Sequence, residues 1–234
     1  MTQIRKSEER GHARHGWLDS YHTFSFANYH DPKHMGFRSL RVINEDRVAP
    51  RQGFGAHGHR DMEILTYVLE GSLAHQDNLG HREVLGPNEI QRMSAGTGVI
   101  HSESNASNTE PVHFLQIWIE PATTGTPSSY EQLRFEPEEK KGKLKLLAAP
   151  QGGNGIAKIN QDAQVFVAAL AKGDEVSHDL GTQRYAWLHL IRGAVTVNGA
   201  TLHTGDAAAI SNEPELRIIG TDAAESEVLL FDLA

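Results

Sequence analysis

The sequence predicts an all-β protein built as two tandem β-barrels, with few short helices. Three observations support this fold class. Short apolar segments recur at intervals of roughly 8–12 residues between turn residues, a spacing typical of β-sandwiches and β-barrels. No long segment carries a helical period of apolar residues. The two halves of the 234-residue chain also resemble each other, and each half is long enough for one barrel.

The first half contains a series of predicted strands, each rich in apolar and β-branched residues. Turn residues separate them, as at Glu70-Gly71 and at Gly86-Pro87-Asn88. The residues before this series form a stretch that we expect to be irregular. The predicted strands are residues 39–48, 62–70, 72–76, 82–85, 89–93 and 112–120.

Two polar segments, residues 121–129 and 136–143, interrupt the strands and indicate a domain boundary. We therefore divide the chain into an N-terminal barrel, residues 1–125, and a C-terminal barrel, residues 126–234. The strands predicted after the interruption are residues 165–171, 187–193, 194–199, 207–211, 215–219 and 227–233.

The segment YVLEGSLAH, residues 67–75, resembles HLIRGAVTV, residues 189–197, and aligns Gly71 with Gly193. Each glycine lies between two apolar strands, where a positive φ is readily adopted. The same alignment places Asp179 opposite His57 and Gly181 opposite His59. The second barrel is therefore expected to lack these histidines and to be structural.

Composition excludes several function classes. The net charge of −8 disfavours nucleic-acid binding and an anionic membrane surface. No apolar run approaches the ~20 residues of a membrane span, and the first residues have no apolar signal segment. The absence of cysteine excludes disulfides and thiolate ligands, so a cytoplasmic location is expected. Fourteen histidines raise the expectation of a metal site.

Two pairs of ligand-type residues carry that expectation. His57 and His59, and likewise His101 and Glu103, are separated by one residue, which places each pair on one face of a strand. Neighbouring strands of a small barrel can bring both pairs to one interior point. Glu63 is an alternative carboxylate, because a continuous strand would place it on the same face as the first two histidines. Such a nitrogen and oxygen donor set suits a divalent first-row ion.

These motifs resemble those of cupins: HxHxxxE at residues 57–63 and GxxHxxxN at residues 98–105. This chain has Gly96-Thr97-Gly98 where the general cupin pattern has Pro-x-Gly, and it has a carboxylate two residues after the later histidine. With these departures the chain resembles the pirin family, especially its bacterial members. The segments that carry the resemblance are residues 15–32, 40–46, 53–71, 75–80 and 94–103 and, more weakly, 130–135 and 228–233.

The resemblance implies a bicupin fold with one metal ion, held by His57, His59, His101 and Glu103 of the N-terminal barrel. It implies that Glu63 is not a direct ligand; we expect it to stand behind the ligands. Fe(II) is the first expectation for the metal, with Ni(II), Co(II), Mn(II) and Zn(II) as alternatives.

The resemblance also implies quercetin 2,3-dioxygenase activity. In that reaction a flavonol hydroxyl binds the metal and loses its proton, with Glu103 or Glu63 as the acceptor, and O2 opens the heterocycle with release of carbon monoxide. The expected partners are therefore O2 and a small aromatic or enolic substrate, and the protein is expected to be monomeric. The alternative is a non-enzymatic, metal-dependent module that acts through protein contacts, as eukaryotic pirins do.

Other conspicuous residues have simpler interpretations. His75 and His81 are expected at exposed hairpin positions, and Asp77 at the surface or barrel rim. Four aromatic residues near the N-terminus are expected to form a packed plug across a barrel rather than a binding platform. They are Trp17, Phe24, Phe26 and Tyr29.

Overall fold

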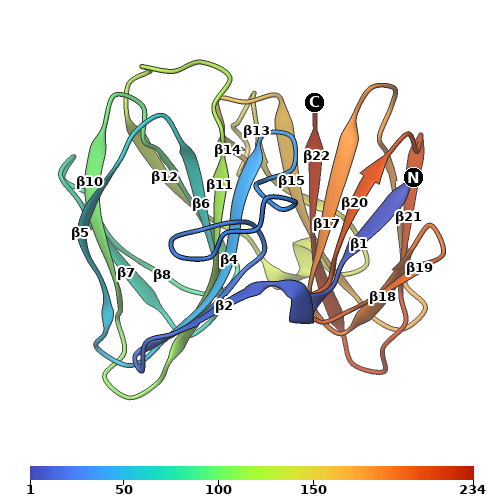
Figure 1. The fold of residues 1–234 in the computed structure, drawn as a ribbon, viewed down its shortest axis with the longest axis horizontal. Helices are drawn as coiled ribbons and strands as arrows, with labels where there is room; N and C mark the ends of the chain where they lie inside the picture. Colours follow the sequence, from blue (N-terminus) through green and yellow to red (C-terminus); the bar gives the residue numbers. More distant parts are fainter. The chain divides into compact units, whose positions relative to one another are not determined.

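The computed structural model describes residues 1–234 and confirms the all-β prediction. It contains strands β1 to β22 and only two short 3-10 helices, η1 (Ser7–Glu9) and η2 (Pro137–Glu139) (Figure 1). No helix has the length and apolar character that crossing a membrane requires.

The chain forms two compact units, and both are discontinuous in sequence. The first barrel comprises Gly11–Phe135 and Gln151–Gln161. The second barrel comprises Met1–Arg10, Glu136–Pro150 and Asp162–Ala234. The division between residues 125 and 126 stays a prediction.

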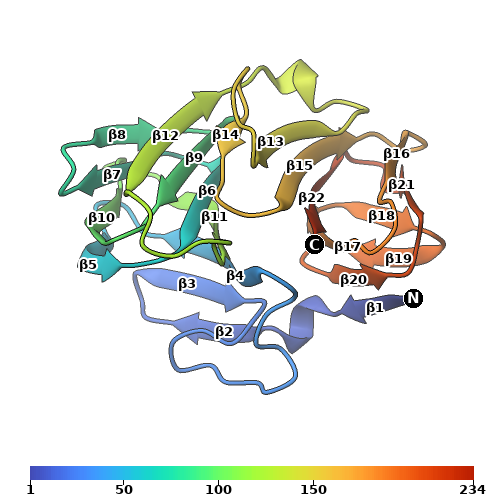
Figure 2. The ribbon, with the colours of Figure 1, turned by 90° about the horizontal axis from the view of Figure 1, so that it is seen from above.

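The first barrel pairs its strands in two antiparallel sheets. The larger sheet has the order β12-β9-β6-β11-β4-β3-β2, and the smaller has the order β5-β10-β7-β8. The smaller sheet closes one side of this barrel (Figure 2). The strands of these two sheets are β2 (Gly11–Arg14), β3 (Leu18–His22), β4 (Leu40–Val48), β5 (Gly53–His59), β6 (Glu63–Glu70), β7 (Leu73–Asp77), β8 (Arg82–Leu85), β9 (Glu89–Ser94), β10 (Val99–Asn105), β11 (Val112–Ile119) and β12 (Ser129–Arg134). The short strand β14 (Ala157–Lys158) belongs to this compact unit but to neither of the two sheets.

Two apolar clusters occupy different levels of the first barrel. Alternate residues of β6 link them, because Ile64 belongs to one cluster and Val68 to the other. Thr66, between these two residues on the same face, is fully buried. A polar level therefore separates the two apolar levels inside this barrel. The apolar clusters are Val48, Val68, Leu73, Leu85, Val112 and Phe114, and Ile64, Met93, Ala95 and Val99.

The second barrel has its own two sheets, and its first strand in sequence, β1, pairs with β20. Its interior is one apolar cluster that includes Leu188, Val195 and Ile218. Asp179 is the last residue of β16, and Gly181 lies beyond its end. The strands are β1 (Thr2–Arg5), β13 (Lys145–Ala149), β15 (Ala163–Leu170), β16 (Glu175–Asp179), β17 (Tyr185–Arg192), β18 (Ala194–Val197), β19 (Ala200–His203), β20 (Ala207–Ser211), β21 (Glu215–Gly220) and β22 (Ser226–Leu233).

The internal resemblance seen in the sequence corresponds to a shared turn. Gly71 joins β6 to β7 with φ +76°, and Gly193 joins β17 to β18 with φ +84°. A Cβ atom on Gly71 would lie 2.6 Å from the Pro111 carbonyl oxygen, so side chains are excluded there by both φ and space.

Candidate metal centre

Three histidines meet where β5 pairs with β10. The antiparallel register places His101 directly opposite His57 and places Val99 opposite His59. The Nε2 atoms of His101 and His57 are 3.0 Å apart. The possible ligand nitrogens of all three histidines lie within 4.8 Å of one another, close enough for one ion to bind all three.

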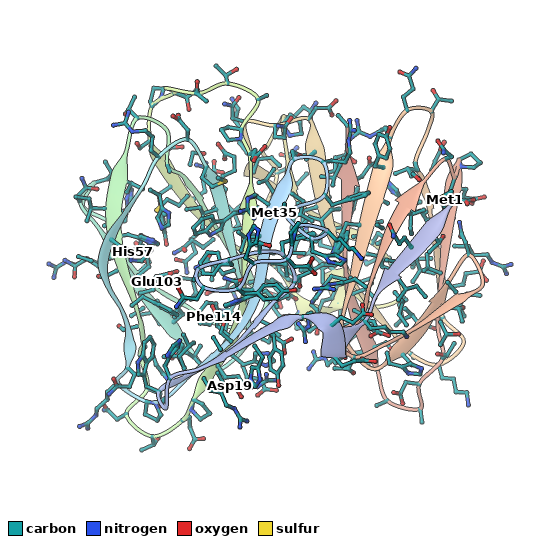
Figure 3. All side chains as sticks on the ribbon, in the orientation of Figure 1. Met1, Asp19, Met35, His57, Glu103 and Phe114 are labelled. Carbon is teal, nitrogen blue, oxygen red and sulfur yellow. The ribbon has the colours of Figure 1, made fainter.

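Glu103 follows His101 on β10, where the register with β5 shifts: His101 lies opposite His57, but Glu103 lies opposite Phe54. This bulge leaves an extra residue in β5 between the two pairs. Glu103 is buried and belongs with His75 and His101 to a second group of possible ligands within 4.8 Å. Figure 3 shows His57 and Glu103 on the same side of the barrel, where β5 pairs with β10.

The unpartnered carboxylate oxygen and the neutral imidazoles of the site are suitable ligands for a metal cation. Glu103 Oε2 accepts a hydrogen bond from Gln116 Nε2 (2.9 Å), whereas its buried Oε1 has no protein partner. Burial, together with the nearby Asp46 carboxylate, raises the pKa of Glu103 to about 7. Burial lowers the pKa of His101 to about 3 and that of His59 to about 4, which favours neutral imidazole, the form that binds metal ions.

A polar row fixes the orientation of Gln116. The register of the larger sheet aligns Asn44, Gln116, Thr66 and Gln91 on neighbouring strands. Thr66 Oγ1 lies 3.0 Å from Gln116 Oε1, so the hydroxyl can donate to that oxygen and turn the amide nitrogen toward Glu103. This row is the polar level between the two apolar clusters.

His75 is buried, so the prediction of an exposed position was wrong. Asp77, the last residue of β7, is buried as well and does not lie at the surface. His75 Nδ1 lies 3.5 Å from His101 Nδ1, and His75 Nε2 lies 3.3 Å from Asp77 Oδ2. The half-exposed His81 contacts the same Asp77 oxygen at 2.8 Å. The alternation of β7, in which residues 73, 75 and 77 face inward, is the signal that could have placed His75 inside.

Glu63 is not on a continuous strand with His57 and His59. The strand β5 ends at His59, β6 begins at Glu63, and Asp61 between them has φ +48°. Glu63 is buried and accepts a hydrogen bond from Ser94 Oγ (2.7 Å), and it belongs to neither group of possible ligands. Burial raises its pKa above the ordinary value.

A cavity of about 600 Å³ lies against this site and is lined in part by His57, His59 and Glu103. Trp118 contacts His59, with ring centroids 4.9 Å apart. Trp17, Phe26 and Tyr29 also line the cavity, so the N-terminal segment is a wall of the site as well as a packed segment. Part of that segment forms β2 and β3 rather than the irregular structure expected.

Family models match both halves of the chain. A model described as Pirin matches residues 3–119, and one described as a quercetinase C-terminal cupin domain matches residues 146–233. The chain is 49% identical over 233 residues to quercetin 2,3-dioxygenase of Escherichia coli K12, covering 100% of this chain and 99% of that protein. It is 40% identical over 235 residues to a pirin-like protein of Caulobacter vibrioides, covering 100% of both chains.

Solved structures are similar over the same length. A crystal structure of the E. coli bacterial pirin YhhW in complex with nickel(II) has a TM-score of 0.93 to this chain at 49% identity. The superposition covers 100% of this chain and 99% of that protein. A second crystal structure of YhhW has a TM-score of 0.95 at 48% identity, covering 100% and 98% of the two chains.

Proposed function

The chain belongs to the pirin family, and from this premise we propose that it is a metal-dependent dioxygenase that opens the heterocycle of a flavonol such as quercetin with release of carbon monoxide. One observation carries the proposal: three imidazoles and a buried carboxylate with a free oxygen adjoin a cavity of about 600 Å³. This volume is within the range of small-molecule sites.

We assign His57, His59, His101 and Glu103 as the ligands of one divalent transition ion. When bound, such an ion lowers the pKa of a coordinated hydroxyl and, if redox-active, supports electron transfer to O2. Fe(II) is the first candidate, and Ni(II), which the similar E. coli pirin holds in its crystal structure, is the second. Metal analysis of the isolated protein decides between them.

The remaining site residues bind, orient and accept a proton. Glu103 is the proposed acceptor for the hydroxyl proton of the flavonol, because Gln116 holds only Oε2 and the free Oε1 that would face the ion has a second lone pair. Glu63, the other candidate acceptor, is engaged by Ser94 instead. The aromatic walls, including Trp118 and Phe26, offer faces for planar rings and exclude water from the reacting atoms.

The test is an assay of the purified protein after reconstitution with each metal in turn. Quercetin should lose its visible absorbance in air, with one O2 consumed and one carbon monoxide released per flavonol, and should persist without O2. His57→Ala should lose both bound metal and turnover, whereas His203→Ala, at an exposed histidine of the second barrel, should keep both.

Full metal content and full turnover in His57→Ala would refute the assignment. Absence of O2 consumption with every metal would favour the non-enzymatic alternative, a metal-dependent protein-interaction module. A monomeric state and a cytoplasmic location stay predictions.

A further inference from the structure

Two polar residues of β4 line the cavity without a role in the mechanism above. Asn44 and Asp46 are both buried, and Asn44 Oδ1 and Asp46 Oδ1 have no protein partner. Because they are two residues apart on a strand, they share one face and lie about 6.6–6.8 Å apart along it. Buried polar atoms normally have hydrogen-bond partners, so a pair of free oxygens on one cavity wall indicates partners supplied by a ligand or water.

The sheet register places this pair beside the metal centre. Asn44 lies directly opposite Gln116, the residue that donates to Glu103. Neighbouring strands are about 4.7–4.9 Å apart, so Asn44 is one strand removed from that amide, and Asp46 is farther along β4. A flat molecule with one oxygen near Glu103 can therefore bring a second oxygen to β4.

The charges that line the cavity restrict which chemical group of the ligand can carry this second oxygen. The cavity is lined by Asp46 and Glu103 and by no lysine or arginine. Away from the histidines that would hold the metal ion, a carboxylate or phosphate on the ligand would thus face Asp46 with no lysine or arginine beside it. Burial raises the pKa of Asp46 to about 7, so this carboxyl group can donate to or accept from a neutral hydroxyl or carbonyl.

We propose that Asn44 and Asp46 form a second recognition point, which binds a hydroxyl or carbonyl of a neutral, planar polyhydroxylated ligand remote from the oxygen that faces the histidines. This inference rests on the proposed function for its probe, a flavonol. It adds that hydroxyl groups other than the reacting one determine which flavonols the cavity accepts.

The experiment compares two flavonols and measures binding separately from turnover. Quercetin carries four hydroxyls besides the reacting one, and 3-hydroxyflavone carries none. Dissociation constants are measured from the ligand's absorbance shift on protein loaded with redox-inert Zn(II). Asp46→Ala should weaken quercetin binding about tenfold or more, the usual effect of losing a hydrogen bond to an ionisable group. Binding of 3-hydroxyflavone and the zinc content should not change.

Glu45→Gln is the matched control. Glu45 is a buried carboxylate on the same strand, it contacts His113 at 3.0 Å, and it is not among the cavity-lining residues. Its substitution should leave both dissociation constants unchanged. Asn44→Ala, with the same selective loss expected, tests the proposal independently if Asp46→Ala fails to fold.

Equal dissociation constants in Asp46→Ala and the parent protein, or equal weakening of both flavonols, would overturn the recognition point. The proposed function fails separately. Selective loss of quercetin binding in a protein that never consumes O2 upholds the recognition point and rejects the dioxygenase. If Asp46→Ala turns over both flavonols as the parent protein does, the dioxygenase is upheld and the recognition point is rejected.

Discussion

At the scale of single residues, His75 has the most consequential position outside the proposed ligands. Asp77 accepts from one ring nitrogen of His75, which leaves the other nitrogen to accept from His101 Nδ1. That arrangement keeps His101 Nε2, the nitrogen facing His57, free of a proton and available to a cation. His75 therefore acts as a positioning residue for His101.

His75→Ala is expected to weaken metal binding roughly 10–100-fold, because groups that orient a ligand typically contribute this much. The measurement is competition with a coloured chelator, followed by comparison of the Co(II) absorption spectrum with that of the parent protein. His81→Ala, on the outer side of Asp77, should change the affinity much less. Equal affinity in His75→Ala and the parent protein would contradict the positioning role.

Asp46 also makes a prediction about stability. Burial raises its pKa in the folded protein from an ordinary 3.8 to about 7. A pKa raised on folding contributes stability below about pH 4, and this contribution is lost as the pH rises through 7. Asp46→Asn should therefore stabilise the metal-free protein more at pH 8 than at pH 5, by roughly 2–3 kcal/mol at about 1.4 kcal/mol per pKa unit. Urea unfolding at both pH values measures the difference; an equal effect at the two values would show that Asp46 is ionised at both.

The sequence predicted which histidines come together but not which polar residues surround them. His57, His59 and His101 are recognisable because ligand types recur at strand spacing. Asn44 and Gln116 lack such a signal, since an amide in a strand is equally compatible with an exposed face. Their cavity roles follow from the register of β4 and β11, which sequence spacing alone does not specify.

At the scale of elements, strands with strong apolar alternation were predictable. The segment predicted at residues 62–70 corresponds to β6, and the segment at 187–193 corresponds to β17. The short strands β2 and β12 were missed, because each has few apolar residues and lies at an edge of the larger sheet. Such strands depend on pairing with a neighbour rather than on their own composition.

The turn at Gly71 provides a prediction at this scale. Gly71→Ala should destabilise the first barrel by about 1–2 kcal/mol for the positive φ and typically a further ~1–3 kcal/mol for the clash with Pro111. Gly125→Ala is the control, because Gly125 has φ +71° but nothing within 4 Å of an added Cβ. Thermal unfolding of both variants separates the two contributions. An equal loss of stability in the two variants would mean that movement of β11 relieves the clash.

At the scale of the whole molecule, each barrel takes part of its structure from a distant segment of sequence. Sequence reasoning divided the chain at one point, because composition marks linkers but does not reveal long-range pairing. In the structure β1 lies beside β20, with Thr2 opposite Ile210 and Arg5 opposite Ala207 (Figure 1). The second barrel thus contains both the first and the last strand of the chain.

Ile4→Asp tests the importance of that first strand. Ile4 packs against the apolar cluster of the second barrel, so burying a carboxylate there should cost roughly 2–3 kcal/mol of folding stability. Gln3→Asp introduces the same charge at the neighbouring exposed position and should have little effect. Denaturant unfolding with tryptophan fluorescence measures both variants, and equal stabilities would show that β1 is dispensable for the second barrel.

The pairing of β1 with β20 has a consequence for synthesis on the ribosome. The opening residues emerge first, yet their hydrogen-bonding partners are translated some two hundred residues later. Until β20 is made, β1 has no strand to pair with. It must stay unpaired while the barrel that carries the histidines is synthesised and folds. Nascent chains arrested before β20 should therefore leave β1 exposed to protease, and chains in which β20 has emerged should protect it.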